Sequence, residues 1–393
     1  MKYSIVLAAL ILISLSYQLN GQDTEGVETG AEQVVNYMPV IRGNNIGIVA
    51  NHTSMVRNVH LIDTLISLNT NIVRIFCPEH GFRGNADAGE EVKSGKDPET
   101  GIPIVSLYGN SKKPTAAQLQ GIDFMLFDLQ DVGVRFYTYI STLHYVMEAC
   151  AQNGIPLVIL DRPNPNGHYI DGPILEPAFK SFVGMHPVPI VHGMTIAEYA
   201  QMINGEGWLA NGITCSLMII KCRNYEHNTR YMLPVPPSPN LKSMLAVYLY
   251  PSTCLFEGTS FSLGRGTNDP FTLYGHPDYP DTGYSFTPES MPGAKSPPHM
   301  GKKCYGVNIA AINLDDILGH HGINLSYITD AYSKAKDKSK FFTAYFDKLA
   351  GNSKLKTQIR NGLSEEQIRE TWKTGLRDFQ EKRTNYLLYR DFQ

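Results

Sequence analysis

The sequence has little excess charge of either sign. Its 34 Lys and Arg residues nearly balance its 37 Asp and Glu residues, which gives a formal net charge of −3. Proteins that bind nucleic acid usually carry a basic patch and a positive balance. The composition therefore predicts no nucleic-acid partner. With 42% hydrophobic and 18% charged residues, it is that of an ordinary globular protein.

Three motifs typical of nucleotide binding or hydrolysis are also missing. No G-x-G-x-x-G follows the first expected strand, and neither a P-loop nor a G-x-S-x-G nucleophile turn occurs. These absences remove the usual sequence support for a dinucleotide site, a nucleoside triphosphate site and a serine nucleophile.

Cysteine is scarce and its spacing is uninformative. The six cysteines form no C-x-x-C, and none lies at zinc-ligand spacing from histidines. We therefore expect no metal site and no cofactor. The sequence leaves open whether some cysteines pair as disulfides. Cys150 and Cys215 lie within apolar runs, which favours buried free thiols.

Only the N-terminus carries a long apolar run. Met1 and Lys2 precede "YSIVLAALILISLSY", and the run ends near the small residue Gly21. This pattern predicts a secretory signal peptide over residues 1–21. A membrane anchor is the alternative, but the run is short for a span and the polar "QLNGQDTEG" follows directly. We expect a periplasmic or secreted protein with no stable membrane insertion after cleavage.

Short apolar runs alternate with helix-period segments over the first two-thirds of the chain. One helical face carries Ile140, Leu143, Met147 and Cys150 before a stop at 153–154. Buried strands that alternate with helices predict an α/β fold with a mostly parallel sheet and helices on both faces. The expected strands are 46–50, 71–76, 102–107, 124–129 and 156–160.

A proline-rich stretch breaks this pattern. "LPVPPSPNL" at 233–241 continues neither a helix nor a central strand, so we expect a crossing segment or an ordered rim. Beyond it we expect a long functional loop at 274–301, a strand within "YGVNIAAINL", and a last helix capped by Ser364 with an apolar stripe from Ile368 to Phe379. The predicted division is a larger domain at 22–250 and a smaller α/β domain at 251–393.

The carboxyl ends of the expected strands are rich in polar residues. Ligands of open α/β sheets bind beyond these ends, so one edge of the sheet should gather the candidate site. Asp161 and Asn164 have an even chance of merely capping turns, and Glu198 fits a helix capping box better than a catalyst. The residues gathered in this way are Asn51, Glu79, His80, Arg83, Tyr108, Asp128, Gln130, Asp131, Arg135, Tyr137, Asp161, Arg162 and Asn164.

Glu79 is the strongest candidate for chemistry. It lies in "IFCPEHGFRG", where Pro78 ends an apolar strand and Gly81 allows close approach to a bound molecule. An acidic residue between Pro, His and Gly has neither a helix-face nor a capping explanation, so function is favoured. Glycoside hydrolases typically use a pair of carboxyl groups for catalysis. Arginines can bind a substrate carboxylate through two hydrogen bonds.

Two other classes remain open at this point. A periplasmic protein that binds a sugar acid without catalysis also uses α/β domains, although binding alone needs no proton donor. A metal-dependent phosphoesterase could use Asp, His and Glu. Release of sugar from a β-linked substrate separates the first class from an enzyme, and insensitivity to chelators argues against the second.

Six blocks in one order resemble a known family. "PEHGFRG", "IPIVSLYG", "FDLQDVGVRFYTY", "LDRPNPNG", "HGMTIAE" and "FEGTSFSLGRGTNDPF" are similar to the exo-β-N-acetylmuramidase (NamZ-type) family, formerly a domain of unknown function. The resemblance covers about residue 35 to the end. It implies a Rossmann-like catalytic domain, a smaller C-terminal domain, a cleft between them, and release of terminal N-acetylmuramic acid from the non-reducing ends of peptidoglycan fragments during cell-wall recycling.

The resemblance also assigns residues. It implies Glu79 as the catalytic glutamate, proposed here as the general acid, and an acidic block in which Asp128 and Asp131 stabilise or orient. The remaining candidates should bind a muropeptide or disaccharide, and whether the anomeric configuration is retained or inverted stays open. These substrate-binding candidates are Asn51, His80, Arg83, Tyr108, Gln130, Arg135, Tyr137, Asp161, Arg162, Asn164, His192 and Arg265.

Overall fold

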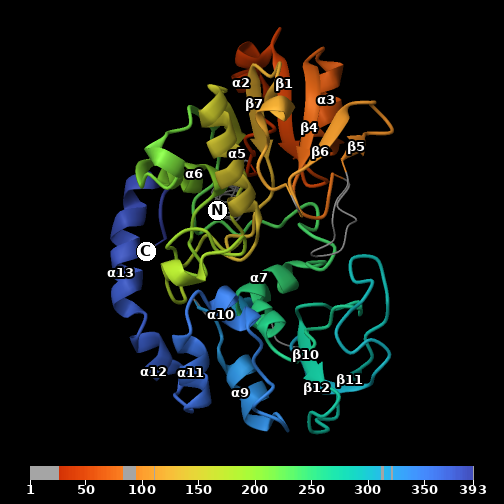
Figure 1. Ribbon diagram of the computed structural model, residues 1–393, viewed down its shortest axis with the longest axis vertical. Helices are drawn as coiled ribbons and strands as arrows, with labels where there is room; N and C mark the ends of the chain where they lie inside the picture. The colour runs from red at the N-terminus through yellow and green to blue at the C-terminus, as the bar shows by residue number, and fades with distance from the viewer. Residues whose placement is uncertain (1–25, 83–93, 110, 311–313, 320–321, 393) are drawn as a thin grey trace, which may run out of the picture.

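The computed structural model describes residues 26–82, 94–109, 111–310, 314–319 and 322–392 (Figure 1). The predicted signal peptide and Arg83 lie outside these residues. A mostly parallel sheet occupies one end of the molecule, and a smaller antiparallel sheet with several short helices occupies the other.

Within the described residues the main sheet has seven strands, and all neighbouring pairs are parallel except β5 with β6. The five predicted strands are confirmed within one or two residues at each end. β5 and β9 were not predicted from the sequence. In spatial order the strands are β5 (Gly95–Lys96), β6 (Pro103–Ser106), β4 (Asn71–Cys77), β1 (Asn45–Ala50), β7 (Phe124–Asp128), β8 (Leu157–Leu160) and β9 (Leu217–Ile220).

Helices cover both faces of this sheet, as predicted. Alternate strand residues point to opposite faces, and each face has its own apolar cluster. Ile48 and Ile75 pack in the cluster that contains α2 and α3, whereas Val49 and Phe76 pack with α5 and α6. The helices of this domain are α2 (Val34–Ile41), α3 (Leu61–Ser67), α4 (Ala116–Leu119), α5 (Tyr139–Asn153) and α6 (Ile196–Gly205).

The strand order is that of a Rossmann fold. Without the antiparallel edge strand β5, the parallel strands run 3-2-1-4-5-6 in chain order, so the order reverses between β1 and β7. Ligands of such sheets bind outside the carboxyl ends near this reversal. The chain segments after β1, β4, β6 and β7 therefore face the expected position of the site.

The second part of the chain forms the smaller domain. β10, β12 and β11 pair antiparallel in that order, and short helices pack around them. The predicted strand in "YGVNIAAINL" is present as β12, and the predicted boundary after residue 250 falls inside α7. The elements are α7 (Met244–Thr253), β10 (Leu273–His276), β11 (Ser285–Phe286), β12 (Cys304–Asn308), α8 (Leu314–Gly319), α9 (Ser326–Lys334), α10 (Tyr345–Ala350), α11 (Lys354–Arg360), α12 (Glu365–Glu370) and α13 (Lys373–Arg383).

The single last helix predicted from the sequence is wrong, because the chain breaks into α12 and α13 at Thr371 and Trp372. The capping box of Ser364 is present as expected. Thr371 caps α12, with its hydroxyl donating to the carbonyl of Ile368. Ile368, Trp372 and Phe379 are all buried nevertheless. The apolar stripe is therefore real, but it is divided between two helices.

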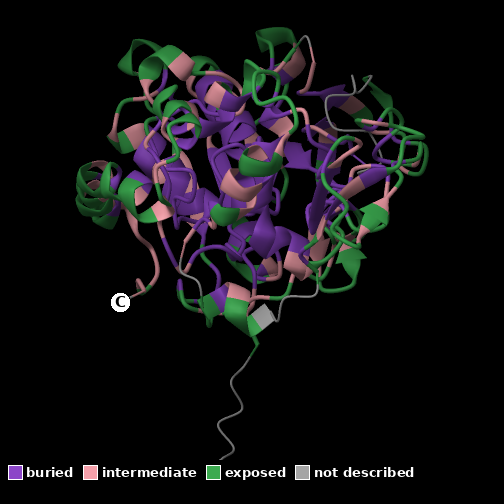
Figure 2. Cartoon of the chain, turned by 90° about the horizontal axis from the view of Figure 1, so that it is seen from below, coloured by how far each residue is buried: buried purple, intermediate pink, exposed green. Residues whose placement is uncertain are grey.

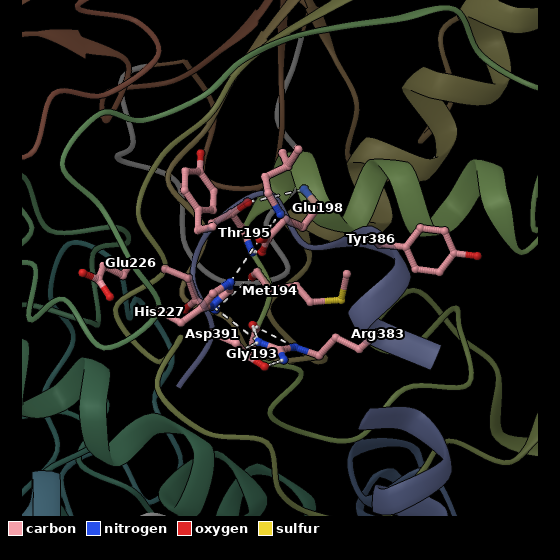
Figure 3. A network of polar contacts seen from close by, with 12 residues as sticks. Gly193, Met194, Thr195, Glu198, Glu226, His227, Arg383, Tyr386 and Asp391 are labelled. Carbon is pink, nitrogen blue, oxygen red and sulfur yellow. Dashed lines mark hydrogen bonds and ion pairs between the residues drawn. The ribbon is translucent and has the colours of Figure 1, made fainter. Parts of the chain in front are cut away.

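The C-terminus returns to the first domain. Figure 1 shows α13 running back along the side of the molecule toward α6. Figure 3 shows the fully buried Arg383, whose Nη1 donates to Asp391 Oδ2 (2.7 Å) and whose Nη2 donates to the carbonyl of Gly193 (2.5 Å). The backbone N–H of Leu388 donates to Glu198 Oε1 (2.8 Å). These contacts fix the second domain against the first.

The interior of the molecule is continuous across both parts. Figure 2 shows buried residues gathered at the centre, with exposed residues around them. All six cysteines lie within the described residues and are buried free thiols, as expected for Cys150 and Cys215. None of the helices in the described part of the chain has the length and apolar character needed to cross a membrane.

Candidate active site

A cavity of about 450 Å³ lies where the two parts of the chain meet. Its volume is within the range of small-molecule sites. One wall comes from the loops after β4 and β6 and from the start of α5. The opposite wall comes from the region of Glu257 to Phe271, from residues 293–298 and from Tyr345. The residues between 233 and 241 form part of the rim through Ser238 and Leu241, as expected of an ordered crossing segment.

Glu79 lies on the first wall, on the tight turn predicted from its sequence. β4 ends at Cys77, and the N–H of Gly81 donates to the carbonyl of Pro78 (3.1 Å). His80 has a φ of 70°, a left-handed conformation that costs a non-glycine residue about 1 kcal/mol or more. The turn leaves Glu79 half-buried at the cavity, where the Thr138 hydroxyl donates to its Oε2 (2.8 Å).

Glu257 supplies a second carboxylate from the opposite wall. Arg265 donates to Glu257 Oε1 through Nε (2.8 Å) and lies over the ring of Phe271 at 5.1 Å. Burial alone would lower the pKa of Arg265, but Glu257 reverses this effect and the pKa is raised. The ion pair therefore fixes the position of the Glu257 carboxyl group in the cavity wall.

Two tyrosines connect the carboxylates electrostatically. Burial, followed by the negative charges of Glu79 and Glu257, raises the pKa of Tyr108. Partial burial and then the same two carboxylates raise the pKa of Tyr345, with Glu257 the stronger. Both tyrosine hydroxyls therefore lie close enough to both glutamates to be affected by their charges.

Tyr137 lines the cavity as predicted, and Asn51 supports it from behind. The Tyr137 hydroxyl donates to the carbonyl of Pro237 (2.7 Å), and its ring meets that of Tyr139 edge to face at 4.7 Å. Asn51 is fully buried, and its Nδ2 donates to the Tyr139 hydroxyl (2.7 Å). The carboxyl end of β1 thus positions an aromatic wall and does not itself reach the cavity.

Asp128 and Arg162 form a buried pair away from the cavity wall. Arg162 donates to Asp128 through Nε (2.5 Å) and Nη2 (2.9 Å), and both residues are at most 4% exposed. A pair closed in this way connects β7 to the loop after β8. The sequence predicts direct contact of these two residues with substrate, but neither of them lines the cavity.

Arg135 is also structural in its position. It is fully buried, and its guanidinium donates to the carbonyls of Pro173, Val188, Leu349 and Ala350, so it joins the two domains. Asp131 instead accepts from the N–H of Gly133 (2.7 Å), and no ion pair joins it to Arg135 within the described residues.

The other predicted contacts serve the fold in a similar way. Gln130 donates to the carbonyls of Asp131 and Pro163. Asn164 accepts from the N–H of Asn166 (2.8 Å), which is the turn-capping role weighed from the sequence. Two predicted binding residues remain, Asp161 and His192. Asp161 accepts from the N–H of Ala197 at the start of α6. The buried ring of His192 accepts from the N–H of Met194.

Comparison with known proteins decides the family. Residues 46–245 match the model of the exo-β-N-acetylmuramidase NamZ N-terminal domain, and residues 248–389 match that of the C-terminal domain. The peptidoglycan β-N-acetylmuramidase NamZ of Bacillus subtilis is 40% identical over 385 residues, which cover 92% of this chain and 91% of the relative. The chain belongs to the NamZ family. It is therefore a glycosidase, which favours an enzyme over a protein that only binds a sugar acid.

Two crystal structures of DUF1343 family proteins from Bacteroides fragilis have the same fold. One has a TM-score of 0.87 at 48% identity, and the other has a TM-score of 0.76 at 26% identity. Each alignment covers 93% of this chain and 99% of the other chain. The two-domain NamZ architecture is thus present over nearly the whole molecule.

The cavity takes residues from both NamZ domains, and this explains what the sequence missed. Glu79, His80, Tyr108, Tyr137 and Arg265 line it as predicted. Glu257 was overlooked although it lies within the quoted "FEGTSFSLGRG" block. Glu257 lies in the short helical turn Cys254–Gly258, and only the fold brings it to the same cavity as Glu79. Among the residues that the structure describes, no group of three or more His, Cys, Asp or Glu side chains is placed to hold a metal ion.

Asp131 should make the stability of this NamZ protein depend on pH. Burial raises the pKa of its carboxyl from 3.8 to about 7, and its Oδ1 has no hydrogen-bond partner among the described residues. Between these values the folded protein keeps a proton that the unfolded chain has released, so the free energy of unfolding falls as the pH rises. The fall attributable to Asp131 is on the order of 4 kcal/mol and is complete above about pH 7.

We expect Asp131→Asn to remove this component. Urea unfolding should give a variant that is more stable than the parent, by a margin that is small near pH 5 and grows until about pH 7. Asp161, whose pKa burial also raises to about 7, remains in both proteins and supplies a residual slope. Equal pH slopes in the two proteins would show that Asp131 is already ionised in the fold.

Proposed function

We propose that the protein is an exported exo-β-N-acetylmuramidase that removes terminal β-1,4-linked N-acetylmuramic acid from the non-reducing ends of peptidoglycan fragments, in cell-wall turnover or recycling. The observation that carries this proposal is the pairing of Glu79 and Glu257 across one cavity in a chain of the NamZ family. The activity in the printed name of the Bacillus subtilis relative agrees with it.

Glu79 acts as the general acid. A sugar alkoxide leaves poorly at neutral pH, so the glycosidic oxygen must receive a proton as the bond breaks. Thr138 holds the Glu79 carboxyl at 2.8 Å, and Tyr108 lies beside it in the same wall. These contacts fix the rotamer of the acid, so that the proton is delivered along one direction.

Glu257 acts on the other side of the bond. Its ion pair with Arg265 holds it in one orientation, which suits a carboxylate that stabilises the oxocarbenium-like centre or directs water. Asp131 does not line the cavity and accepts from the N–H of Gly133, while Asp128 stabilises the loops through Arg162. The catalytic pair is thus Glu79 and Glu257, one from each domain.

Digestion of a defined disaccharide tests the proposed activity. A β-1,4-linked N-acetylmuramyl-N-acetylglucosamine should yield equal amounts of the two free sugars, whereas the same sugars linked in the reverse order should remain intact. Mass spectrometry of the products distinguishes these results. Binding of the first disaccharide without cleavage, or cleavage of both, would contradict an exo-acting muramidase.

Export is the second part of the proposal. Its support is the basic start and the apolar run before Gly21. We expect the protein isolated from the envelope or medium of its native cells to begin near residue 22, as measured by intact mass and N-terminal sequencing. A protein recovered with Met1 and the apolar run still attached would refute cleavage.

A further inference from the structure

Tyr345 is an exposed aromatic residue in the wall of the active-site cavity. It is the first residue of α10, in the second domain, and 37% of its surface is exposed. Within the described part of the chain, its ring stacks on no other aromatic ring and its hydroxyl has no hydrogen-bond partner. Ligand pockets are typically lined by aromatic side chains with a few polar groups among them, and one tyrosine supplies both.

Several other aromatic side chains of the cavity wall are held by the protein itself. Phe136, Tyr250 and Phe271 are at most 8% exposed. The ring of Tyr250 meets that of Phe136 edge to face at 5.4 Å and that of Phe271 at 5.1 Å. The hydroxyl of Tyr137 donates to a backbone carbonyl. These side chains shape the cavity, whereas Tyr345 keeps both its ring and its hydroxyl for a ligand.

The backbone of Tyr345 is fixed beside the turn that carries Glu257. The N–H of Thr343 donates to the carbonyl of Gly258 (2.9 Å). Gly258 allows α10 to pack closely on this turn, because a Cβ at Gly258 would lie 2.4 Å from the Cα of Phe346. The start of α10 therefore keeps a constant position relative to Glu257, while the Tyr345 ring remains open to the cavity.

The hydroxyl of Tyr345 lies where the charges of both glutamates reach it. Partial burial raises its pKa first, and the negative charges of Glu257 and, less strongly, Glu79 raise it further. A phenol with a raised pKa stays protonated at neutral pH, so it donates a hydrogen bond and is a poor nucleophile. A sugar bound between the two carboxyl groups would lie close to this donor.

We propose that Tyr345 binds the terminal N-acetylmuramic acid, with its ring against the C–H groups of one sugar face and its hydroxyl donating to a sugar oxygen near the glycosidic bond. The inference rests on the proposed function. The faces of a pyranose carry apolar C–H groups, and their burial against an aromatic ring removes apolar surface of both partners from water. Tyr345 is a substrate-binding residue and takes no part in proton transfer.

Two variants separate the ring of Tyr345 from its hydroxyl. Tyr345→Ala should raise the KM for p-nitrophenyl β-N-acetylmuraminide, and the calorimetric Kd for free N-acetylmuramic acid, about tenfold to a hundredfold. Tyr345→Phe keeps the ring and loses one hydrogen bond, so it should raise both constants only about twofold to tenfold. Tyr284→Ala is the matched control, since Tyr284 is partly exposed on the same domain and does not line the cavity.

The outcomes separate the inference from the function beneath it. A Tyr345→Ala enzyme that keeps the KM and Kd of the parent, or that loses only kcat, overturns the binding role of Tyr345. A Tyr345→Phe enzyme that binds the sugar as weakly as Tyr345→Ala overturns the contact through the ring. A parent enzyme that leaves the muraminide intact contradicts the proposed function itself, whatever the variants do.

Discussion

Glu79→Gln should lower turnover of the natural disaccharide by at least about a hundredfold, while folding and sugar binding persist. The amide keeps the shape of the carboxyl and can still accept from Thr138, but it has no proton to give to the leaving oxygen. Steady-state release of free sugar measures turnover, and calorimetric binding of the intact disaccharide measures affinity.

A substrate with a good leaving group is the internal control for Glu79. A phenolate leaves with little need of a proton, so Glu79→Gln should lose much less on the p-nitrophenyl muraminide in the bond-breaking step. Equal losses on both substrates would assign Glu79 to a nucleophilic or orienting role. Full activity on both would remove it from the site.

Glu257→Gln should lower turnover by at least about a hundredfold on both substrates. A carboxylate that stabilises the anomeric centre or directs water is needed whatever group leaves, so the phenyl substrate should not rescue this variant. The same substitution also leaves the half-buried Arg265 without its acidic partner, and circular dichroism must show that the fold survives.

Glu289→Gln is the matched control for Glu257. Glu289 is exposed on the same domain and does not line the cavity, so the turnover of the Glu289→Gln variant should equal that of the parent enzyme. Loss of activity by Glu257→Gln on the disaccharide alone, with the phenyl substrate spared, would exchange the roles proposed for the two glutamates.

The sheet could be predicted from the sequence because its signals are local. β1 and β4 are mostly apolar runs, although Arg74 interrupts β4, and their parallel arrangement agrees with the helix α3 between them. The turn at Glu79 was also readable, since Pro78 and Gly81 restrict the backbone directly. The division into α12 and α13 could not be predicted from the sequence, because the helical spacing of apolar residues continues without a break from Ile368 through Trp372.

The polar residues at the strand ends could not be sorted from sequence alone. Asp128 ends the buried strand β7 and Glu79 follows the buried strand β4, yet Asp128 is enclosed with Arg162 while Glu79 faces the cavity. That difference depends on which partner lies opposite each carboxylate in three dimensions. Glu257 is the converse case, because a residue with an ordinary local pattern becomes a site residue only when the second domain is brought against the first.

A crystal structure of Glu79→Gln with the intact disaccharide tests the account most directly. We predict that the sugar lies in the cavity between the domains, with the glycosidic oxygen about 3 Å from the substituted side chain at position 79 and Glu257 on the far side of the anomeric carbon. A disaccharide whose glycosidic bond lies against Asp131 or outside this cavity would contradict it.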